Sequence, residues 1–207
     1  MGNLFLDLDG TIINCRRRLY DLFAELVPHN DLSCDDYWGV KRGGLRQEDL
    51  LRNRLNLNES QISSYKTDWL AHIEDEERLA ADIVIPGIPE FIQNKAENNF
   101  LHLVTNRQYH DRVLKQLGSM RLAHLFQNIL VTEQRISKAG LIKKNGIKIK
   151  VTDAFIGDTG EDILTARELG CRSVAVSWGF LSEICIASYQ PDFIANKVED
   201  LVQCPLI

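Results

Sequence analysis

The sequence lacks the features that mark several large classes of protein. None of its apolar runs approaches the ~20 residues that a membrane-spanning helix needs. It contains no internal repeat and no low-complexity stretch. Positive charge is not in excess either, since the formal net charge is −5. Proteins that bind nucleic acid by neutralising phosphates carry the opposite sign. We therefore expect no membrane and no nucleic acid among its partners.

Metal-binding patterns of cysteine and histidine are also missing. The five cysteines are an odd number, no pair has zinc-knuckle spacing, and the five histidines are scattered. We expect reduced thiols of the kind found in cytoplasmic proteins. An acidic residue already stands at position 7, which is not typical of a secretory signal. A cytoplasmic location is the expectation.

The chain does have the composition of an ordinary globular protein. Hydrophobic residues make up 44% and charged residues 26% of the 207 positions, enough for one large domain or one domain with an insert. Strand-like apolar runs alternate with helical patterns, near residues 3–7, 100–105, 128–132, 152–157, 172–177 and 192–195. This alternation predicts an α/β fold with a mainly parallel sheet.

A long segment without strand pattern follows the first run. Its apolar residues recur at helical spacing, as Leu19 and Leu22 do. A structureless loop of this length is implausible in a compact protein. We therefore predict a helical insert over residues 14–84, and a core domain made of residues 1–13 and 85–207.

The first apolar run ends in two closely spaced acids, Asp7 and Asp9, followed by Gly10. Side chains two apart on a strand point the same way, so these carboxylates face one small volume. They repel each other there unless a metal ion, a shared proton or a chemical role requires them. An Asp-Gly turn accounts for Asp9 but not for Asp7.

Matching polar residues follow the later runs. Thr105 and Asn106 end the second run, Asp158 ends another, Asp162 comes four residues later, and Lys138 opens a helical segment. The carboxyl ends of parallel strands meet in one crevice, so these side chains are expected to converge. A divalent-cation site, a cationic clamp and a hydroxyl donor together suit phosphoryl chemistry, which depends on positioning and charge neutralisation.

Taken in order, these motifs resemble the four motifs of the haloacid dehalogenase (HAD) superfamily over nearly the whole chain. The resemblance implies a three-layer Rossmann-like core with a parallel sheet. It also implies a small helical cap, called a C1 cap, inserted after the first strand. The implied activity is a phosphatase that hydrolyses a small phosphomonoester with Mg²⁺, and phosphoglycolate phosphatase is the nearest subtype.

The resemblance also assigns roles to the motif residues. Asp7 would be the nucleophile that forms an aspartyl-phosphate, and Asp9 the general acid and base. Phosphate binding would fall to Thr105, Asn106 and Lys138.

The metal ligands implied by the resemblance are Asp7, Asp9 through its backbone carbonyl, Asp158 and Asp162. Oxygen ligands are the kind that Mg²⁺ prefers. An acid in the first turn of a helix is an alternative explanation for Asp162.

Two assignments stay open at this point. Lys138, Lys143 and Lys144 are all candidates for the lysine of the phosphate site. We prefer Lys138, because Ser137 can cap the helix that follows it. Arg107 is as compatible with the surface as with the site.

The insert offers its own cations. Lys41, Arg42 and Arg46, in a segment that contains two glycines, are candidates for substrate selection, with a solvated basic loop as the alternative. The arginine run that ends at Arg18 is interpreted as a solvated helix start.

Other functions remain possible on the sequence alone. A sugar-phosphate mutase of the β-phosphoglucomutase type would use the same two acids, Asp7 and Asp9. A receiver-like signalling domain or a non-catalytic binding protein fits the complete motif set less well. The expected partner is a small phosphorylated metabolite, with the protein a monomer or homodimer.

Overall fold

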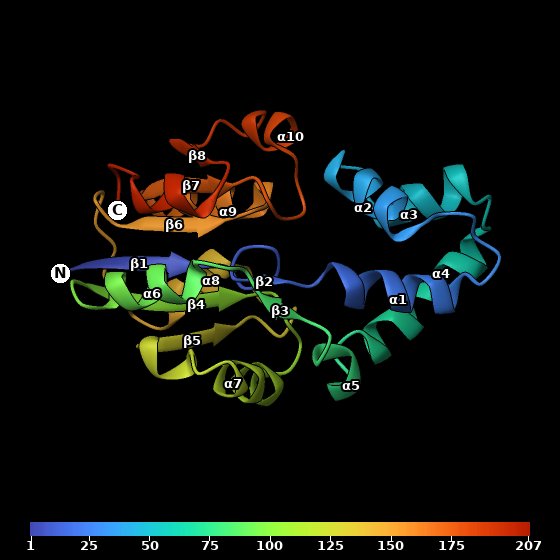
Figure 1. Ribbon diagram of the computed structural model, residues 1–207, viewed down its shortest axis with the longest axis horizontal. Coiled ribbons are helices and arrows are strands. Elements are labelled where there is room, and N and C mark those ends of the chain that lie inside the picture. The colour runs from blue at the N-terminus through green and yellow to red at the C-terminus, as the bar shows by residue number, and fades with distance from the viewer.

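The computed structural model describes all residues, 1–207, and places a six-stranded sheet at the centre of the larger of its two parts (Figure 1). All neighbouring strands are parallel, in the order β5-β4-β1-β6-β7-β8. The strands are β1 (Gly2–Leu6), β4 (Asn99–Thr105), β5 (Asn128–Val131), β6 (Ala154–Gly157), β7 (Arg172–Val176) and β8 (Phe193–Ala195). The predicted strands are confirmed, with ends that shift by no more than two residues.

Helices cover both faces of this sheet, because its strands are apolar on both sides. Leu4 and Leu6 of β1 belong to the core cluster with α6, α7 and α11, whereas Phe5 packs on the opposite side with α8 and α9. The helices are α6 (Ile88–Ala96), α7 (His110–Ser119), α8 (Lys138–Lys144), α9 (Gly160–Leu169), α10 (Glu183–Ala187) and α11 (Val198–Val202). The predicted three-layer α/β core is thus confirmed.

The smaller part of the chain is helical and has a hydrophobic core of its own. It contains α1 (Arg16–Leu26), α2 (Cys34–Arg42), α3 (Gln47–Asp49), a π-helical turn (Leu50–Arg54), α4 (Glu59–His72) and α5 (Glu76–Leu79). Leu22, Phe23 and Tyr37 are among its fully buried residues. Asn58 and Gln61 form a capping box at the start of α4. No helix of the chain is long and apolar enough to cross a membrane.

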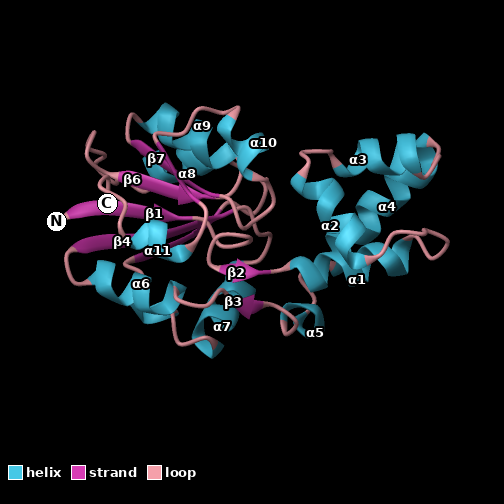
Figure 2. Cartoon of the chain, turned by 45° about the horizontal axis from the view of Figure 1, so that its top comes forward, coloured by secondary structure: helices cyan, strands magenta, loops and turns pink.

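Two short strands join the helical part to the sheet. β2 (Ile13–Asn14) pairs antiparallel with β3 (Ile83–Val84), so both chain crossings run side by side (Figure 2). These strands leave no signal in the sequence, because two residues are too few for an alternating pattern. Both termini lie at the end of the sheet away from the helical part (Figure 1).

A neutral histidine is built into the sheet. His102 in β4 is 2% exposed and stacks on Phe5 with ring centroids 4.9 Å apart. Its Nε2 lies 3.0 Å from Oδ1 of Asn3, and its Nδ1 lies 2.9 Å from Nδ2 of Asn128. The neutral ring with its proton on Nε2 satisfies both contacts. Burial accordingly lowers the pKa of His102 to about 4.

We expect His102 to make the protein sensitive to acid. The ordinary pKa of 6.5 applies in the unfolded chain, so the stabilising effect of the neutral ring is complete above that pH. It is lost as the pH falls toward 4, by about 3 kcal/mol in all. Between about pH 7 and pH 4, the unfolding temperature should therefore fall less steeply for His102→Gln than for the wild type. The exposed His29, replaced by Gln, should leave the wild-type slope unchanged, and equal slopes for all three proteins would contradict the assignment.

Candidate active site

The carboxyl ends of the sheet strands lie on the side of the helical part (Figure 1), and the motif residues stand at or just after these ends. Asp7 directly follows β1, Thr105 is the last residue of β4, and Asp158 follows β6. Because β1 pairs with both β4 and β6, these three positions are neighbours in space. Lys138 is the first residue of α8. The structure therefore brings together side chains that lie far apart in the sequence, such as Asp7 and Asp158.

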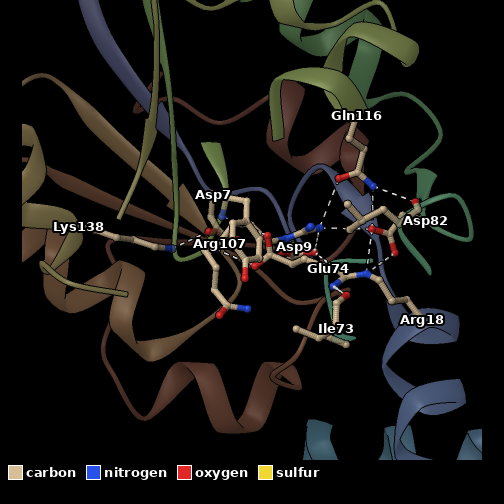
Figure 3. Close-up of polar contacts among 12 residues, drawn as sticks. Asp7, Asp9, Arg18, Ile73, Glu74, Asp82, Arg107, Gln116 and Lys138 are labelled. Atoms are coloured by element: carbon tan, nitrogen blue, oxygen red, sulfur yellow. Dashed lines mark hydrogen bonds and ion pairs between the residues drawn. The ribbon is translucent and has the colours of Figure 1, made fainter. Parts of the chain in front are cut away.

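Three of the acids form a buried cluster. Carboxylate oxygens of Asp7, Asp158 and Asp162 all lie within 4.8 Å of one another. The Nζ of Lys138 donates to one oxygen of Asp7 and one of Asp162, at 2.6 Å each (Figure 3). Asp162 also accepts from the backbone N–H and the hydroxyl of Thr159, so it both caps α9 and faces the cluster. The two explanations that the sequence allowed for Asp162 are compatible.

The charges of this cluster are not balanced by protein groups alone. Burial raises the pKa of Asp7 to about 7, an effect that Asp162 reinforces and Lys138 opposes. Burial, and then the charges of Asp7 and Asp162, also raise the pKa of Asp158. Three carboxylates share one lysine, so the all-oxygen donor set fits a hard divalent cation such as Mg²⁺.

The turn after Asp9 leaves room for Asp158. Gly10 has φ +87°, and a Cβ atom there would lie 2.2 Å from Oδ2 of Asp158. The hydroxyl of Thr11 donates to Oδ1 of Asp158 at 3.1 Å, and the N–H of Phe180 donates to Oδ2 at 2.6 Å. Contacts from two distant loops thus fix the orientation of this carboxylate.

Of the three candidate lysines, Lys138 lies in the site. It is 3% exposed, and the hydroxyl of Ser137 before it accepts from the N–H of Gly140, as expected of a helix cap. Its pKa is raised, because Asp162 and Asp7 outweigh the effect of burial. Lys143 is exposed and pairs with Glu168, and Lys144 is exposed as well.

Thr105 and Asn106 lie beside the acid cluster. Thr105 is 1% exposed, and both residues line the same cavity as Asp7. Nδ2 of Asn106 donates to the two carboxylate oxygens of Glu161 at 2.9 and 2.8 Å, and Oδ1 accepts from the hydroxyl of Thr132 at 3.0 Å. Glu161 therefore holds the amide of Asn106, a contact that its position in the first turn of α9 did not reveal.

The carboxylate of Asp9 is not part of the acid cluster but is held by two arginines. Arg107 donates to both of its oxygens through Nε and Nη2, and Arg18 donates to it through Nη2. Although burial acts in the opposite direction, Arg107 and Arg18 hold the pKa of Asp9 well below its usual range.

Asp82 connects the same two arginines to the rest of the protein. Its oxygens accept from Nε of Arg18 at 3.0 and 3.1 Å, and one of them accepts from Nη2 of Arg107 at 3.3 Å. The amide of Gln116 in α7 donates to it at 2.9 Å. Figure 3 shows Lys138 approaching Asp7 on one side of Asp9, and the Arg18–Asp82–Gln116 contacts on the other.

The sequence interpretation of Arg18 was wrong, since this side chain is 3% exposed rather than solvated. It stands four residues before the buried Leu22 on α1, on the same helical face, and that spacing could have revealed its burial. The sequence did not decide whether Arg107 lies on the surface or in the site. In the structure it is 4% exposed and contacts Asp9.

The cations expected to select the substrate lie elsewhere. Arg42 donates to the backbone carbonyls of Gly179 and Ser177 at 2.7 and 2.8 Å. Lys41 donates to Gln47, and the exposed Arg46 pairs with Asp49. None of the three lines the cavity with Asp7 and Asp9. Each of these cations already has a partner of its own, and their role in substrate selection stays a prediction.

A cavity of about 240 Å³ is lined by Asp7, Asp9, Thr105, Asn106 and Lys138, among others. It lies between the two parts of the chain and suits a small ligand rather than a polymer. Its lining combines residues from the sheet edge with Leu19, Trp69, Ile73 and Glu74 from the helical part, and with Phe180. Phe180 is packed against Trp38 of α2, with ring centroids 5.4 Å apart.

Comparison with known proteins matches the chain to one family and to named relatives. The family described as haloacid dehalogenase-like hydrolase matches residues 4–176. Pyrophosphatase PpaX of Listeria innocua is 23% identical over 211 aligned residues, which cover 96% of this chain and 94% of the relative. Phosphoglycolate phosphatase 1 of Pseudomonas aeruginosa is 25% identical over 223 aligned residues, which cover 97% and 78%.

Solved structures show the same fold. A haloacid dehalogenase-like hydrolase from Streptococcus pneumoniae superposes with a TM-score of 0.80, covering 98% of this chain and 97% of the other. The two sequences are 21% identical, so this likeness concerns the fold.

Proposed function

Because the chain belongs to the haloacid dehalogenase-like hydrolase family, as its four motifs predicted, we propose that it is a phosphatase acting on a small phosphomonoester. The observation that carries the proposal is the buried Asp7, with Nζ of Lys138 at 2.6 Å and Thr105 in the same cavity. The proposed nucleophile and the proposed phosphate-binding residues thus line the same cavity. Relatives named as phosphatases over most of this chain support the same activity.

The proposed reaction has two steps. Asp7 attacks the phosphorus atom, and the bond between phosphorus and the ester oxygen breaks as Asp9 donates a proton to the leaving oxygen. In the second step Asp9 accepts a proton from water, which attacks the aspartyl-phosphate and releases inorganic phosphate and the free carboxylate of Asp7. Contacts with Arg107 and Arg18 favour the charged form of Asp9, which the second step needs. In the first step Asp9 must carry a proton, so its contacts with Arg107 and Arg18 must weaken in the substrate complex.

Residues around the nucleophile would bind the transferred group. Lys138 would neutralise charge on the phosphoryl oxygens, and Thr105 would donate a hydrogen bond to them. Asn106 would donate to them only after its amide exchanges Glu161 for the phosphoryl group. Asp7, Asp158 and Asp162 would hold Mg²⁺, together with the backbone carbonyl of Asp9 that the family resemblance implies. When bound, the ion supplies positive charge to the phosphoryl group. The acid cluster with its single lysine fits this ion.

We expect Mg²⁺ to stabilise the protein against heat. Binding to the folded state alone would contribute about 2.7 kcal/mol at a concentration 100 times the dissociation constant. For a chain of 207 residues, this corresponds to a rise of roughly 5 to 10 °C in the unfolding temperature. The Asp158→Asn variant should lose most of this rise, whereas an exposed Asp111→Asn variant should retain it. Differential scanning calorimetry with MgCl₂ and with EDTA measures the shift, and no shift in the wild type would contradict the site.

The helical residues 14–84 would act as a lid over the site. Leu19, Trp69 and Ile73 contribute to the cavity from this part of the chain, and the β2–β3 pair is the place for a hinge. Closing would exclude water from the aspartyl-phosphate until the leaving group departs. The cytoplasmic location and the monomeric or homodimeric state remain predictions.

Phosphate release from a panel of small phosphomonoesters, and from pyrophosphate, tests the proposed function. Each compound is assayed with MgCl₂ and with EDTA. Release that requires Mg²⁺ is the expected result, and phosphoglycolate and pyrophosphate are included because relatives carry those names. A folded protein that releases phosphate from none of them would contradict the proposal and make sugar-phosphate isomerisation the next assay.

A further inference from the structure

Arg107, a residue that lines the cavity, has one buried donor without a partner within the protein. Arg107 is 4% exposed and lines the cavity that contains Asp7 and Lys138. Its Nε and Nη2 donate to Asp9, and Nη2 also contacts Asp82 and Gln116. Its Nη1 is buried and makes no hydrogen bond. A buried N–H group without an acceptor is unfavourable, so an acceptor that reached this atom would stabilise the site.

The surroundings keep the guanidinium of Arg107 in place. Asp9 takes the side that carries Nε and Nη2, which leaves Nη1 for another acceptor. Arg18 lies against the same Asp9 carboxylate and lines the same cavity, so a second positive charge is near. The three hydrogen-bonding nitrogens of Arg18 already contact Asp82, Ile73 and Asp9, so it adds charge rather than a free donor.

The lid holds the segment that carries Arg107. Glu74, which is 2% exposed, accepts from the backbone N–H groups of Gln108 at 2.7 Å and Tyr109 at 3.4 Å. Asp82 reaches Arg107 from the end of the same helical part. The position of Nη1 therefore depends on the lid being docked as it is in this structure.

We propose that Arg107, assisted by the charge of Arg18, forms a subsite for a second anionic group of the substrate, a carboxylate or a second phosphoryl group. The proposal rests on the proposed phosphatase function, which uses Lys138, Thr105 and Asn106 for the reacting phosphoryl group and uses Nε and Nη2 of Arg107 to hold Asp9, but leaves Nη1 of Arg107 without a role. An anion binds well here because a charged acceptor meets a preformed, buried guanidinium. The cavity of about 240 Å³ admits only a short connection between the two anionic groups.

Binding of phosphonates, which are not hydrolysed, tests this subsite without turnover. Isothermal calorimetry in MgCl₂ compares phosphonoacetate, which adds a carboxylate, and methylenediphosphonate, which adds a second phosphoryl group, with propylphosphonate, which adds neither. We expect the wild type to bind at least one two-anion compound about tenfold or more tightly than propylphosphonate. Which of the two binds more tightly distinguishes the two sources of the anion.

Substitution of Arg107 locates the effect. In Arg107→Gln the preference for the two-anion compound should fall to about twofold or less, while propylphosphonate binds within about threefold of wild type. The exposed Arg54, which does not line the cavity, is the control: Arg54→Gln also removes a positive charge and should retain the full preference. Arg107→Lys keeps the charge but not the planar donor set, and should restore only part of it.

Two results would overturn the subsite. Equal wild-type affinity for all three compounds would show that no second anion is recognised, and this measurement does not depend on the folding of any variant. An equal loss for all three compounds in a folded Arg107→Gln protein would show a structural role only. If phosphonates with two anions bind preferentially but no ester is hydrolysed, the proposed function fails and the subsite stands.

Discussion

Replacement of Asp7 by asparagine is expected to reduce phosphate release by roughly 10⁴-fold or more, because the variant has no carboxylate to form the aspartyl-phosphate. The neutral amide should be accommodated structurally. The site buries Asp7 at a cost that already raises its pKa to about 7, and Lys138 retains Asp162 as a partner. The measurement is the initial rate of phosphate release on the best substrate of the panel, with thermal unfolding in parallel.

A matched control makes this result specific. Asp111 lies in the first turn of α7, is exposed, and makes no ion pair or side-chain hydrogen bond, so Asp111→Asn should keep the wild-type rate. A folded Asp7→Asn protein that retains activity within about tenfold of wild type would exclude Asp7 as the nucleophile. It would direct attention to a water molecule activated elsewhere in the cavity.

Replacement of Arg18 by methionine is expected to have the largest effect on stability, a loss of about 3–5 kcal/mol in the free energy of unfolding. The side chain is 3% exposed and is the principal counter-charge of Asp82, whose carboxylate is fully buried. Methionine fills similar space but leaves that charge poorly compensated, and leaves the Ile73 carbonyl without its donor. For a chain of 207 residues the unfolding temperature should fall by roughly 6 to 20 °C.

The neighbouring residue offers the control. Arg17 lies on the same helix, has a side chain that is 70% exposed, and pairs only with Asp21 one turn later. Arg17→Met should leave the free energy of unfolding nearly unchanged, because an exposed ion pair contributes little to stability. Equal unfolding temperatures for the two variants would mean that the contacts between Arg18, Asp9 and Asp82 contribute little to holding the two parts of the chain together.

The alternation of apolar runs and helical patterns determined most of the core. Strands such as Asn99–Thr105 are apolar enough to be recognised without knowledge of their neighbours, and a parallel sheet follows from the crossovers between them. The pair β2 and β3 escaped prediction because its pairing depends on the two crossings lying together, which is not a property of either segment.

The sequence alone determined the family and the residues attached to strand ends and helix starts, namely Asp7, Thr105, Lys138 and Asp158. Each of these positions is set by a local pattern, so its place at the sheet edge follows once the strands pair. Only the tertiary structure decided the partners of Asp9. Its contacts with Arg18 and Arg107, and their link to Asp82, join segments whose meeting depends on how the helical part docks on the sheet. The same docking brings Arg42 to backbone carbonyls of the core domain. No pattern in the segment around Arg42 indicates these contacts.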